Sequence, residues 1–127
     1  MSIEYLRNQK KYLSQPYVIG RGFEYQVMKH LRKQGWYVIR KFGSWGEEDL
    51  VAIKSVDRLL ILAKVWFIQC KYSRKKATSM FDMPKFQRRK LVEKAKRYGA
   101  EPIFAGVKEP GKRPRMYFER IYADYEK

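Results

Sequence analysis

The sequence predicts one α/β domain in which helices pack on a mixed β-sheet. The chain has 127 residues, which suits one compact domain, and 45% of them are hydrophobic, enough to fill a core. Apolar residues recur at helical spacing in two segments and as short β-branched or aromatic runs in five others. The resulting order, α-β-β-β-α-β-β, predicts a mixed sheet flanked by helices.

The first helix is expected over residues 18–34, where Gly35 supplies a stop. Three apolar residues recur on one face of this segment: Phe23, Val27 and Leu31. His30 falls on the same stripe, and we interpret it as a packed histidine or one at the edge of the core. Residues 1–16 are polar and basic, so we expect a basic amino-terminal arm or short helix, followed by a folded domain of residues 17–127.

The first three strands follow this helix. Residues 36–39 are aromatic and β-branched and predict a strand, and residues 49–53 predict a second one after a loop. The apolar run of residues 59–70 is too long for an ordinary strand. We therefore expect it to contain a turn or bulge near Ala63 and Lys64, with a strand on its carboxyl side.

The second helix is expected to begin at Pro84, because proline suits the first turn of a helix, and to end at Gly99. Its apolar positions are Phe86, Leu91, Ala95 and Tyr98. Two final strands are predicted at residues 102–107 and 115–121, joined by a turn at residues 109–112 that contains proline and glycine.

The charge balance points to a polyanionic partner. Lys and Arg number 29 against 13 Asp and Glu, which leaves a net charge of +16. Nucleic acid is the first expectation, and an anionic membrane surface is the second. No apolar stretch approaches the roughly 18 residues that span a bilayer, and the first residues do not resemble a secretory signal. Cys70, the one cysteine, excludes an intramolecular disulfide and suits a reducing cytoplasm.

Carboxylates on structured elements are scarce in so basic a chain. Glu24 lies at the edge of the helical stripe that should face the sheet, where an unpaired charge is costly. It has an ordinary alternative as a first-turn or exposed acid beside Arg21. Asp49 lies at the start of a strand, although with Glu47 and Glu48 it could also form a solvated acidic loop.

Gln69 and Lys71 are two residues apart in a strand and therefore project from the same face. Cys70 between them is most simply a small buried hydrophobe. The ordinary alternative is a strand that has reached solvent, with Gln69 hydrogen-bonded locally. Taken together with Glu24 and Asp49, however, these residues could surround one oxygen-liganded divalent cation, with a lysine nearby. Hydrolysis of a phosphodiester requires this combination.

These residues belong to an ordered set of short motifs between residues 18 and 121. The set resembles the archaeal and archaeal-virus Holliday-junction resolvases of the PD-(D/E)XK nuclease superfamily. The motifs are Gly22-Phe23-Glu24, residues 35–40 running into Gly43-Ser44, residues 49–52, Gln69-Cys70-Lys71, and residues 95–99 before Pro102-Ile103. The resemblance implies a restriction-endonuclease-like fold and a Mg²⁺-dependent endonuclease that resolves four-way DNA junctions as a homodimer. It also implies the host-cell cytoplasm as location if the chain is viral.

The resemblance also implies residue roles. Lys71 matches the catalytic lysine, and Ser44 matches a loop serine near the scissile phosphate. The implied metal ligands are Glu24, Asp49, Gln69 and the backbone carbonyl of Cys70, and Mn²⁺ is expected to substitute for Mg²⁺. Gln69 stands where the family usually carries glutamate. Its amide oxygen can bind Mg²⁺ but brings no charge, so the site would hold the metal less tightly or depend more on Asp49 and Glu24.

Basic residues near this site are expected to hold duplex DNA by its phosphates without reading bases. They are Arg40, Lys41, Arg74, Lys75, Lys76, Arg88 and Arg89, of which the last two are expected on the polar side of the second helix. A simply solvated basic face remains an alternative for each of them. Candidate exposed apolar residues for the dimer, each equally compatible with the core, are Phe81, Met83, Phe104 and Tyr117.

Three other functions remain open from the sequence. A related nuclease acting on nicks, flaps or ends would use the same metal site. A non-catalytic duplex-binding protein would explain Gln69 as the mark of a decaying site. A small basic RNA-binding protein would explain the charge, but it would not explain the placing of Glu24, Asp49 and Lys71.

Overall fold

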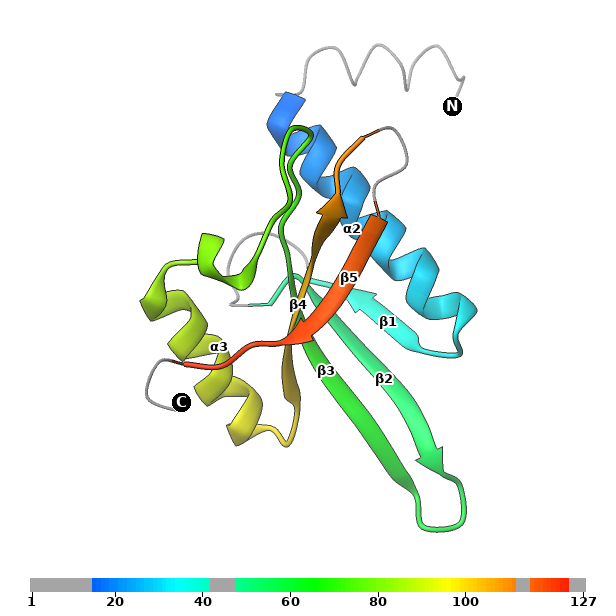
Figure 1. Cartoon of the computed structure of the whole chain (residues 1–127). Helices are drawn as coiled ribbons and strands as arrows, with labels where there is room; N and C mark the ends of the chain where they lie inside the picture. Colours follow the sequence, from blue (N-terminus) through cyan, green and yellow to red (C-terminus); the bar gives the residue numbers. More distant parts are fainter. Residues whose placement is uncertain (1–14, 42–47, 112–114, 124–127) are drawn as a thin grey trace.

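The computed structural model describes residues 15–41, 48–111 and 115–123, with side chains described from residue 21 onward (Figure 1). Its elements, in chain order, are α2 (Gln15–Lys33), β1 (Tyr37–Arg40), β2 (Leu50–Asp57), β3 (Leu62–Cys70), the 3₁₀ turn η1 (Met80–Asp82), α3 (Lys85–Arg97), β4 (Glu101–Glu109) and β5 (Arg115–Arg120). This order confirms the predicted succession of two helices and five strands and the mixed α/β class.

The strands of the described residues form one sheet in the order β1-β2-β3-β4-β5. The pairs β1–β2, β2–β3 and β4–β5 are antiparallel, whereas β3 and β4 are parallel. Parallel neighbours need a crossover connection, and η1 with α3 supplies it. The central strand β3 therefore has an antiparallel neighbour on one side and a parallel neighbour on the other, and its carboxyl end lies inside the sheet.

Each face of the sheet has its own core, and Figure 1 shows one helix on either side of the sheet. Ile68 and Cys70 of β3 pack in the core that contains residues of α2, whereas Phe67 packs in the core that contains residues of α3. Successive side chains of a strand alternate between faces. Gln69 is therefore directed to the same side as Phe67, and Lys71 continues this alternation just beyond the strand.

Helix α2 carries the predicted apolar face. Phe23, Val27 and Leu31 are buried in the core. The ring of His30 is half-buried and stacks on Phe118 with 5.7 Å between ring centroids, which confirms a packed histidine. Residues 1–14 of the predicted arm lie outside the described residues, and the last two residues of the arm already belong to the helix.

The apolar run of residues 59–70 contains a turn, as predicted, but the turn is not at Ala63 and Lys64, and the irregularity in the β2–β3 register lies between Ser55 and Asp57, opposite Ala63 and Leu62. Strand β3 runs without a break from Leu62 to Cys70, and the chain reverses earlier, at residues 58–61. The reason is Asp57, whose Oδ1 accepts hydrogen bonds from the backbone N–H groups of the residues two and three positions later, at 2.9 and 3.2 Å. An aspartate that accepts hydrogen bonds in this way stabilises a turn at the start of the apolar run, a few residues before Ala63 and Lys64.

The predicted apolar face of the second helix is confirmed at Leu91 and Ala95 and wrong at Phe86 and Tyr98. The buried residues of α3 are Arg88, Leu91, Val92 and Ala95, whereas Phe86 and Tyr98 are exposed. Arg88 was expected on the polar side, and this prediction is wrong, because the residue is only 4% exposed. Its Nη1 donates to the carbonyl of Met83 at 2.6 Å, so the burial of its guanidinium is compensated by a hydrogen bond.

Two of the residues considered for a dimer surface are in the core instead. Met83 and Phe104 are buried in the α3-side core because η1 and β4 turn them inward. Tyr117 is half-buried and donates its hydroxyl to the carbonyl of Thr78 at 2.6 Å. Phe81 is the exposed member of this set.

Thr78 fastens the loop that follows β3. Its hydroxyl donates to the carbonyl of Lys71 at 3.0 Å and accepts from the N–H of Val107 at 2.9 Å. The neighbouring strand residue is Gly106, where a Cβ atom would lie 2.7 Å from the hydroxyl oxygen of Thr78 and would also contact the ring of Phe104. Glycine at this position therefore permits the close approach that closes the loop.

We predict that Gly106→Ala lowers the free energy of unfolding by about 1–3 kcal/mol, because an extra methyl group must displace well-packed neighbours. Urea denaturation of the purified protein measures this change. Gly22→Ala is the matched control, since a Cβ atom there meets nothing within 4 Å and alanine favours a helix. A Gly106→Ala protein as stable as the wild type would contradict the close packing.

Candidate metal and nucleic-acid site

Asp49 is fastened to the end of β3 by two hydrogen bonds. Its backbone N–H donates to the carbonyl of Ile68 at 2.7 Å, and its Oδ2 accepts from the N–H of Cys70 at 2.9 Å. These two bonds bracket Gln69, the residue between their partners. The carboxylate of Asp49 is therefore held at the mouth formed by the start of β2 and the end of β3.

Glu24 reaches the same region from α2. Its Oε2 accepts from Nε of Arg40 at 2.8 Å, and both side chains are mostly buried. The cation beside Glu24 is therefore Arg40 at the end of β1, whereas the guanidinium of Arg21 lies 5.9 Å from the ring of Tyr25. This ion pair restrains the carboxylate at the edge of the sheet.

The pKa of Asp49 reports the surroundings of the mouth. Burial raises this pKa from 3.8 to about 6, and the hydrogen bond from the N–H of Cys70 opposes the rise. The carboxylate of Glu24 contributes to this rise, while Lys71 and Arg40 oppose it. Burial also raises the pKa of the Cys70 thiol, and Asp49 and Glu24 add to that rise. Glu24 from α2 and Lys71 after β3 are therefore both close enough to Asp49, at the start of β2, for their charges to shift its pKa.

The donor set at this mouth suits a hard divalent cation. The carboxylates of Asp49 and Glu24 are oxygen donors of the kind that Mg²⁺ takes, and the amide of Gln69, which is 7% exposed, and the carbonyl of Cys70 follow at the end of β3. Within the described part of the chain, no three His, Cys, Asp or Glu side chains come close enough to hold a metal ion. The Asp49–Glu24 pair thus needs Gln69 or a backbone carbonyl to complete a site. A cation here would relieve the repulsion between the two acids.

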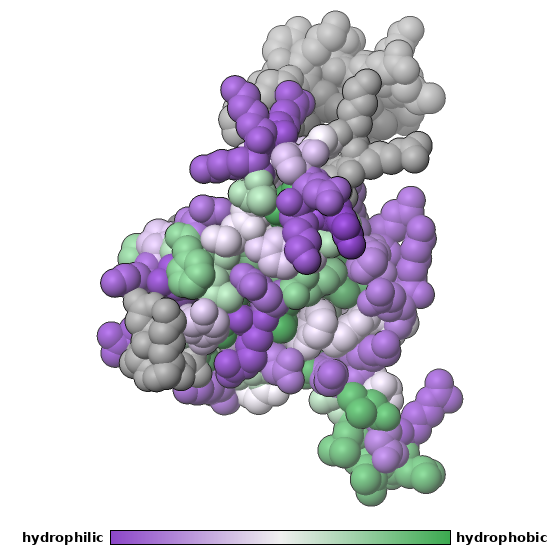
Figure 2. All heavy atoms as spheres, in the orientation of Figure 1, coloured by the Kyte–Doolittle hydropathy of each residue, from purple (hydrophilic) through white to green (hydrophobic). Residues whose placement is uncertain are grey.

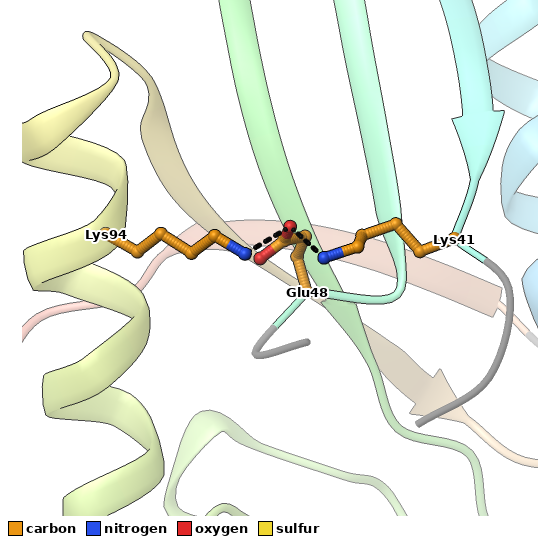
Figure 3. Close-up of polar contacts among 3 residues, drawn as sticks. All are labelled: Lys41, Glu48 and Lys94. Atoms are coloured by element: carbon orange, nitrogen blue, oxygen red, sulfur yellow. Dashed lines mark hydrogen bonds and ion pairs between the residues drawn. The ribbon is translucent and has the colours of Figure 1, made fainter. Parts of the chain in front are cut away.

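Glu48 corrects the expectation of a solvated acidic loop. It is buried, and its Oε1 accepts from Nζ of both Lys41 and Lys94 at 2.9 Å (Figure 3). Burial alone would raise the pKa of Glu48, but the hydrogen bonds and charges of the two lysines lower it overall. The residue next to Asp49 is therefore a carboxylate whose charge is compensated by cations of the protein itself.

Sequence reasoning missed the role of Glu48 and its partner on α3. Lys94 follows the buried positions Leu91 and Val92 and precedes Ala95, which places it at the edge of the apolar face. A basic residue at the edge of an apolar face is only a weak signal for a buried ion pair, because Lys94 and Glu48 are 46 positions apart in the sequence. This pairing links α3 to the start of β2.

The predicted DNA-binding residues separate into three groups. Arg74, Lys75 and Lys76 are exposed on the loop after Lys71, where the hydroxyl of Ser73 accepts from two backbone N–H groups of the turn. Arg89 is exposed and pairs with Glu93 at 3.2 Å. The remaining three point into the protein or pair with its carboxylates: Arg40, Lys41 and Arg88. Ser44 lies outside the described residues.

The overall fold has a solved relative. The Holliday junction resolvase Hjc of Archaeoglobus fulgidus, an archaeal hyperthermophile, matches with a TM-score of 0.60 and 22% sequence identity. The match covers 80% of this chain and 76% of that chain. At this identity the similarity concerns the fold. No curated protein matches the sequence.

The sequence itself matches a family model. The model described as archaeal Holliday junction resolvase (Hjc) covers residues 15–125, which include every element of the sheet and both helices. No described helix is long and apolar enough to cross a membrane. The match extends over most of the chain and includes Glu24, Asp49, Gln69 and Lys71. The chain therefore belongs to the archaeal Holliday junction resolvase family.

Proposed function

We propose that the protein is a structure-selective DNA endonuclease that resolves four-way junctions by Mg²⁺-dependent hydrolysis of paired phosphodiester bonds. Membership of the resolvase family supports this function. One structural observation carries it: Asp49 is fixed beside Gln69 at the end of β3, with Glu24 and Lys71 within electrostatic reach. Acids from two elements and a lysine at one strand end provide what hydrolysis of a phosphodiester requires.

The metal would be held by the carboxylates of Glu24 and Asp49, the amide oxygen of Gln69 and the backbone carbonyl of Cys70. When bound, Mg²⁺ or Mn²⁺ supplies an activated water and neutralises charge on the phosphate. The ammonium group of Lys71, whose charge acts on Asp49, would orient that water and stabilise the developing charge on the scissile phosphate. Arg40 would keep Glu24 in place through their ion pair.

The DNA would be held mainly by the exposed cations of the loop after Lys71, which are Arg74, Lys75 and Lys76. Phosphate contacts position a duplex and carry no sequence information, which suits an enzyme that recognises shape. Paired cuts across a two-fold junction need two equivalent sites, so we propose a homodimer. We also propose that it acts in the cytoplasm, that of the host cell if the chain is viral.

Gln69 favours a second candidate, a duplex-binding protein without nuclease activity. The amide removes one of the charges with which this family usually attracts the metal, and it leaves two carboxylates at the mouth. The basic surface would be unaffected by this loss. Cleavage of a junction in the presence of Mg²⁺ separates the two candidates. Cleavage of a nick or flap in place of a junction would indicate the related nuclease instead.

We predict that the wild type makes symmetric paired nicks in a labelled immobile four-way junction in Mg²⁺. Asp49→Asn should reduce the nicking rate by at least about 100-fold, because a charged metal ligand is lost. Junction binding in EDTA should be preserved or tightened, since the basic surface is untouched. Gel assays of nicking and binding, with a matched duplex and a flap as competing substrates, measure both effects.

The control for this experiment is Glu109→Gln, which removes the same charge from an exposed ion pair with Arg115 at the carboxyl end of β4. It should nick like the wild type. Binding without nicking by the wild type in both Mg²⁺ and Mn²⁺ would contradict the enzyme and favour the second candidate. Severe loss of junction binding by Asp49→Asn would contradict a metal-binding role for this residue.

The pKa of Asp49 predicts a pH effect on the metal-free protein. This pKa, about 6, lies above the usual value of an unfolded aspartate, so the protonated form is favoured by folding. The contribution of Asp49 to stability is therefore present below about pH 4 and is lost as the pH rises through 6, by at most on the order of 3 kcal/mol. Urea denaturation in EDTA should show Asp49→Asn gaining stability relative to the wild type over this range. The same difference between the two proteins at every pH would contradict the burial of a titrating Asp49.

Gln69→Glu restores the charge that the family usually places at this position. In EDTA at neutral pH the variant should unfold at a lower temperature than the wild type, because a third carboxylate joins two others at a buried mouth. Added Mg²⁺ should raise its melting temperature more than that of the wild type, and half-maximal nicking should need about tenfold less Mg²⁺. An unchanged Mg²⁺ dependence in both assays would place Gln69 outside the metal site.

A further inference from the structure

The β2–β3 hairpin ends in an apolar tip that projects from the body of the protein. Figure 1 shows the two strands extending beyond the sheet, and Figure 2 shows apolar residues gathered at their end. Leu59 is 94% exposed and Ile61 is 89% exposed. The flanking residues Val56, Leu60 and Leu62 are also more than half exposed. Contiguous exposed apolar residues of this kind mark interaction sites.

The tip is held in one shape rather than left loose. The carboxylate of Asp57 accepts two backbone hydrogen bonds across the turn. Ile61 has a φ of 54°, in the left-handed region that glycine or asparagine occupies at much lower cost than a β-branched residue. A strained isoleucine whose side chain faces solvent adds nothing to the core. Its side chain is therefore better explained by a contact outside the protein.

The charges of the hairpin indicate what kind of partner it meets. Lys54 and Lys64 are directly opposite each other in the β2–β3 register; Lys64 is exposed, and Nζ of Lys54 lies 5.7 Å from the centre of the Trp36 ring. Like charges in this position destabilise a sheet, and an anion between them would relieve the repulsion. Arg58 adds a further cation in the turn, whereas the carboxylate of Asp57 is occupied by backbone N–H groups. The hairpin thus joins an apolar tip to a cationic base.

This combination fits nucleic acid better than a second copy of the chain. A second copy has the same net charge of +16 and would bring cations against cations. Architectural proteins that bind the minor groove insert Leu or Ile side chains between base steps and hold the phosphates with Lys and Arg.

We propose that the β2–β3 hairpin is a second DNA contact, which inserts Leu59 and Ile61 into the minor groove of a duplex arm while Lys54 and Lys64 bind its phosphates. This inference rests on the proposed function, in that the duplex is an arm of the junction. Strand β2 has eight residues, so its end at Asp57 lies about 26 Å from Asp49, and the tip lies beyond it. This span corresponds to about 8 base pairs of B-DNA. The hairpin therefore contacts an arm well away from the scissile phosphate.

Arm length provides the test. Affinities are measured in EDTA for two immobile junctions, one with arms of about 20 base pairs and one with capped arms of about 5, which end short of the hairpin. The ratio of the affinity for long arms to the affinity for short arms should be at least about tenfold larger for the wild type than for the double variant Leu59→Ser/Ile61→Ser. The control Tyr37→Ser, an exposed residue of β1, should keep the wild-type preference. 2-Aminopurine placed about 8 base pairs from the branch point should brighten with the wild type and remain dim with the double variant.

Lys64→Gln separates a DNA contact from a structural role. Its removal ends the like-charge pair, so the melting temperature should rise. The slope of log Kobs against log salt concentration should become shallower by about 0.9, the value for one lost phosphate contact. A structural lysine would instead give a lower melting temperature and an unchanged slope.

Two results would overturn the hairpin proposal. One is a double variant that keeps the full preference for long arms. The other is a double variant whose DNA affinity falls only together with a change of oligomeric state in sedimentation, which would assign the tip to protein–protein contact. The two proposals fail separately. A wild type that never nicks, yet loses its arm preference in the double variant, contradicts the nuclease and supports the hairpin. A wild type that nicks, together with a double variant that keeps the preference for long arms, supports the nuclease and contradicts the hairpin.

Discussion

The candidate site depends on one constraint, the attachment of Asp49 to β3 through both its backbone and its side chain. These two hydrogen bonds set where β2 begins and place a carboxylate beside Gln69 in a poorly solvated mouth. The consequence is a pKa of about 6, so the ionised side chain costs stability at neutral pH. A cation would remove that cost. The same local structure therefore lowers the stability of the metal-free protein and prepares it to bind metal.

Glu48 and Asp49 are adjacent in sequence and have opposite environments. Glu48 pairs with Lys41 and Lys94, and its pKa is lowered, so its charge is neutralised within the protein. Asp49 faces another carboxylate, that of Glu24, and its pKa is raised. Because the two lysines come from the end of β1 and from α3, Glu48 also joins β1 and α3 to the start of β2 (Figure 3). One acid thus stabilises the mouth, and its neighbour remains for the metal.

The features predicted correctly from the sequence depend on local signals. Apolar periodicity and a terminal glycine gave both helices, and Gly35 and Gly99 indeed adopt positive φ after them. Two errors concern side-chain contacts between separate elements. Arg88 is buried because Met83, just after η1, offers it a carbonyl, and Glu48 is buried because α3 supplies Lys94. Neither partner is visible from spacing along the chain. Glu24, Asp49, Gln69 and Lys71 were found as scarce polar groups on structured elements, and their electrostatic proximity is a property of the fold.

Binding of Mn²⁺ in the absence of DNA tests the metal site most directly, because it separates the ligands from cleavage and from junction recognition. Electron paramagnetic resonance measures free Mn²⁺ during titration of the wild type, Asp49→Asn and Glu109→Gln. The wild type and Glu109→Gln should each bind one Mn²⁺ per chain at this site, and Asp49→Asn should lose it. Equal Mn²⁺ binding by all three proteins would contradict a metal site at the junction of β2 and β3.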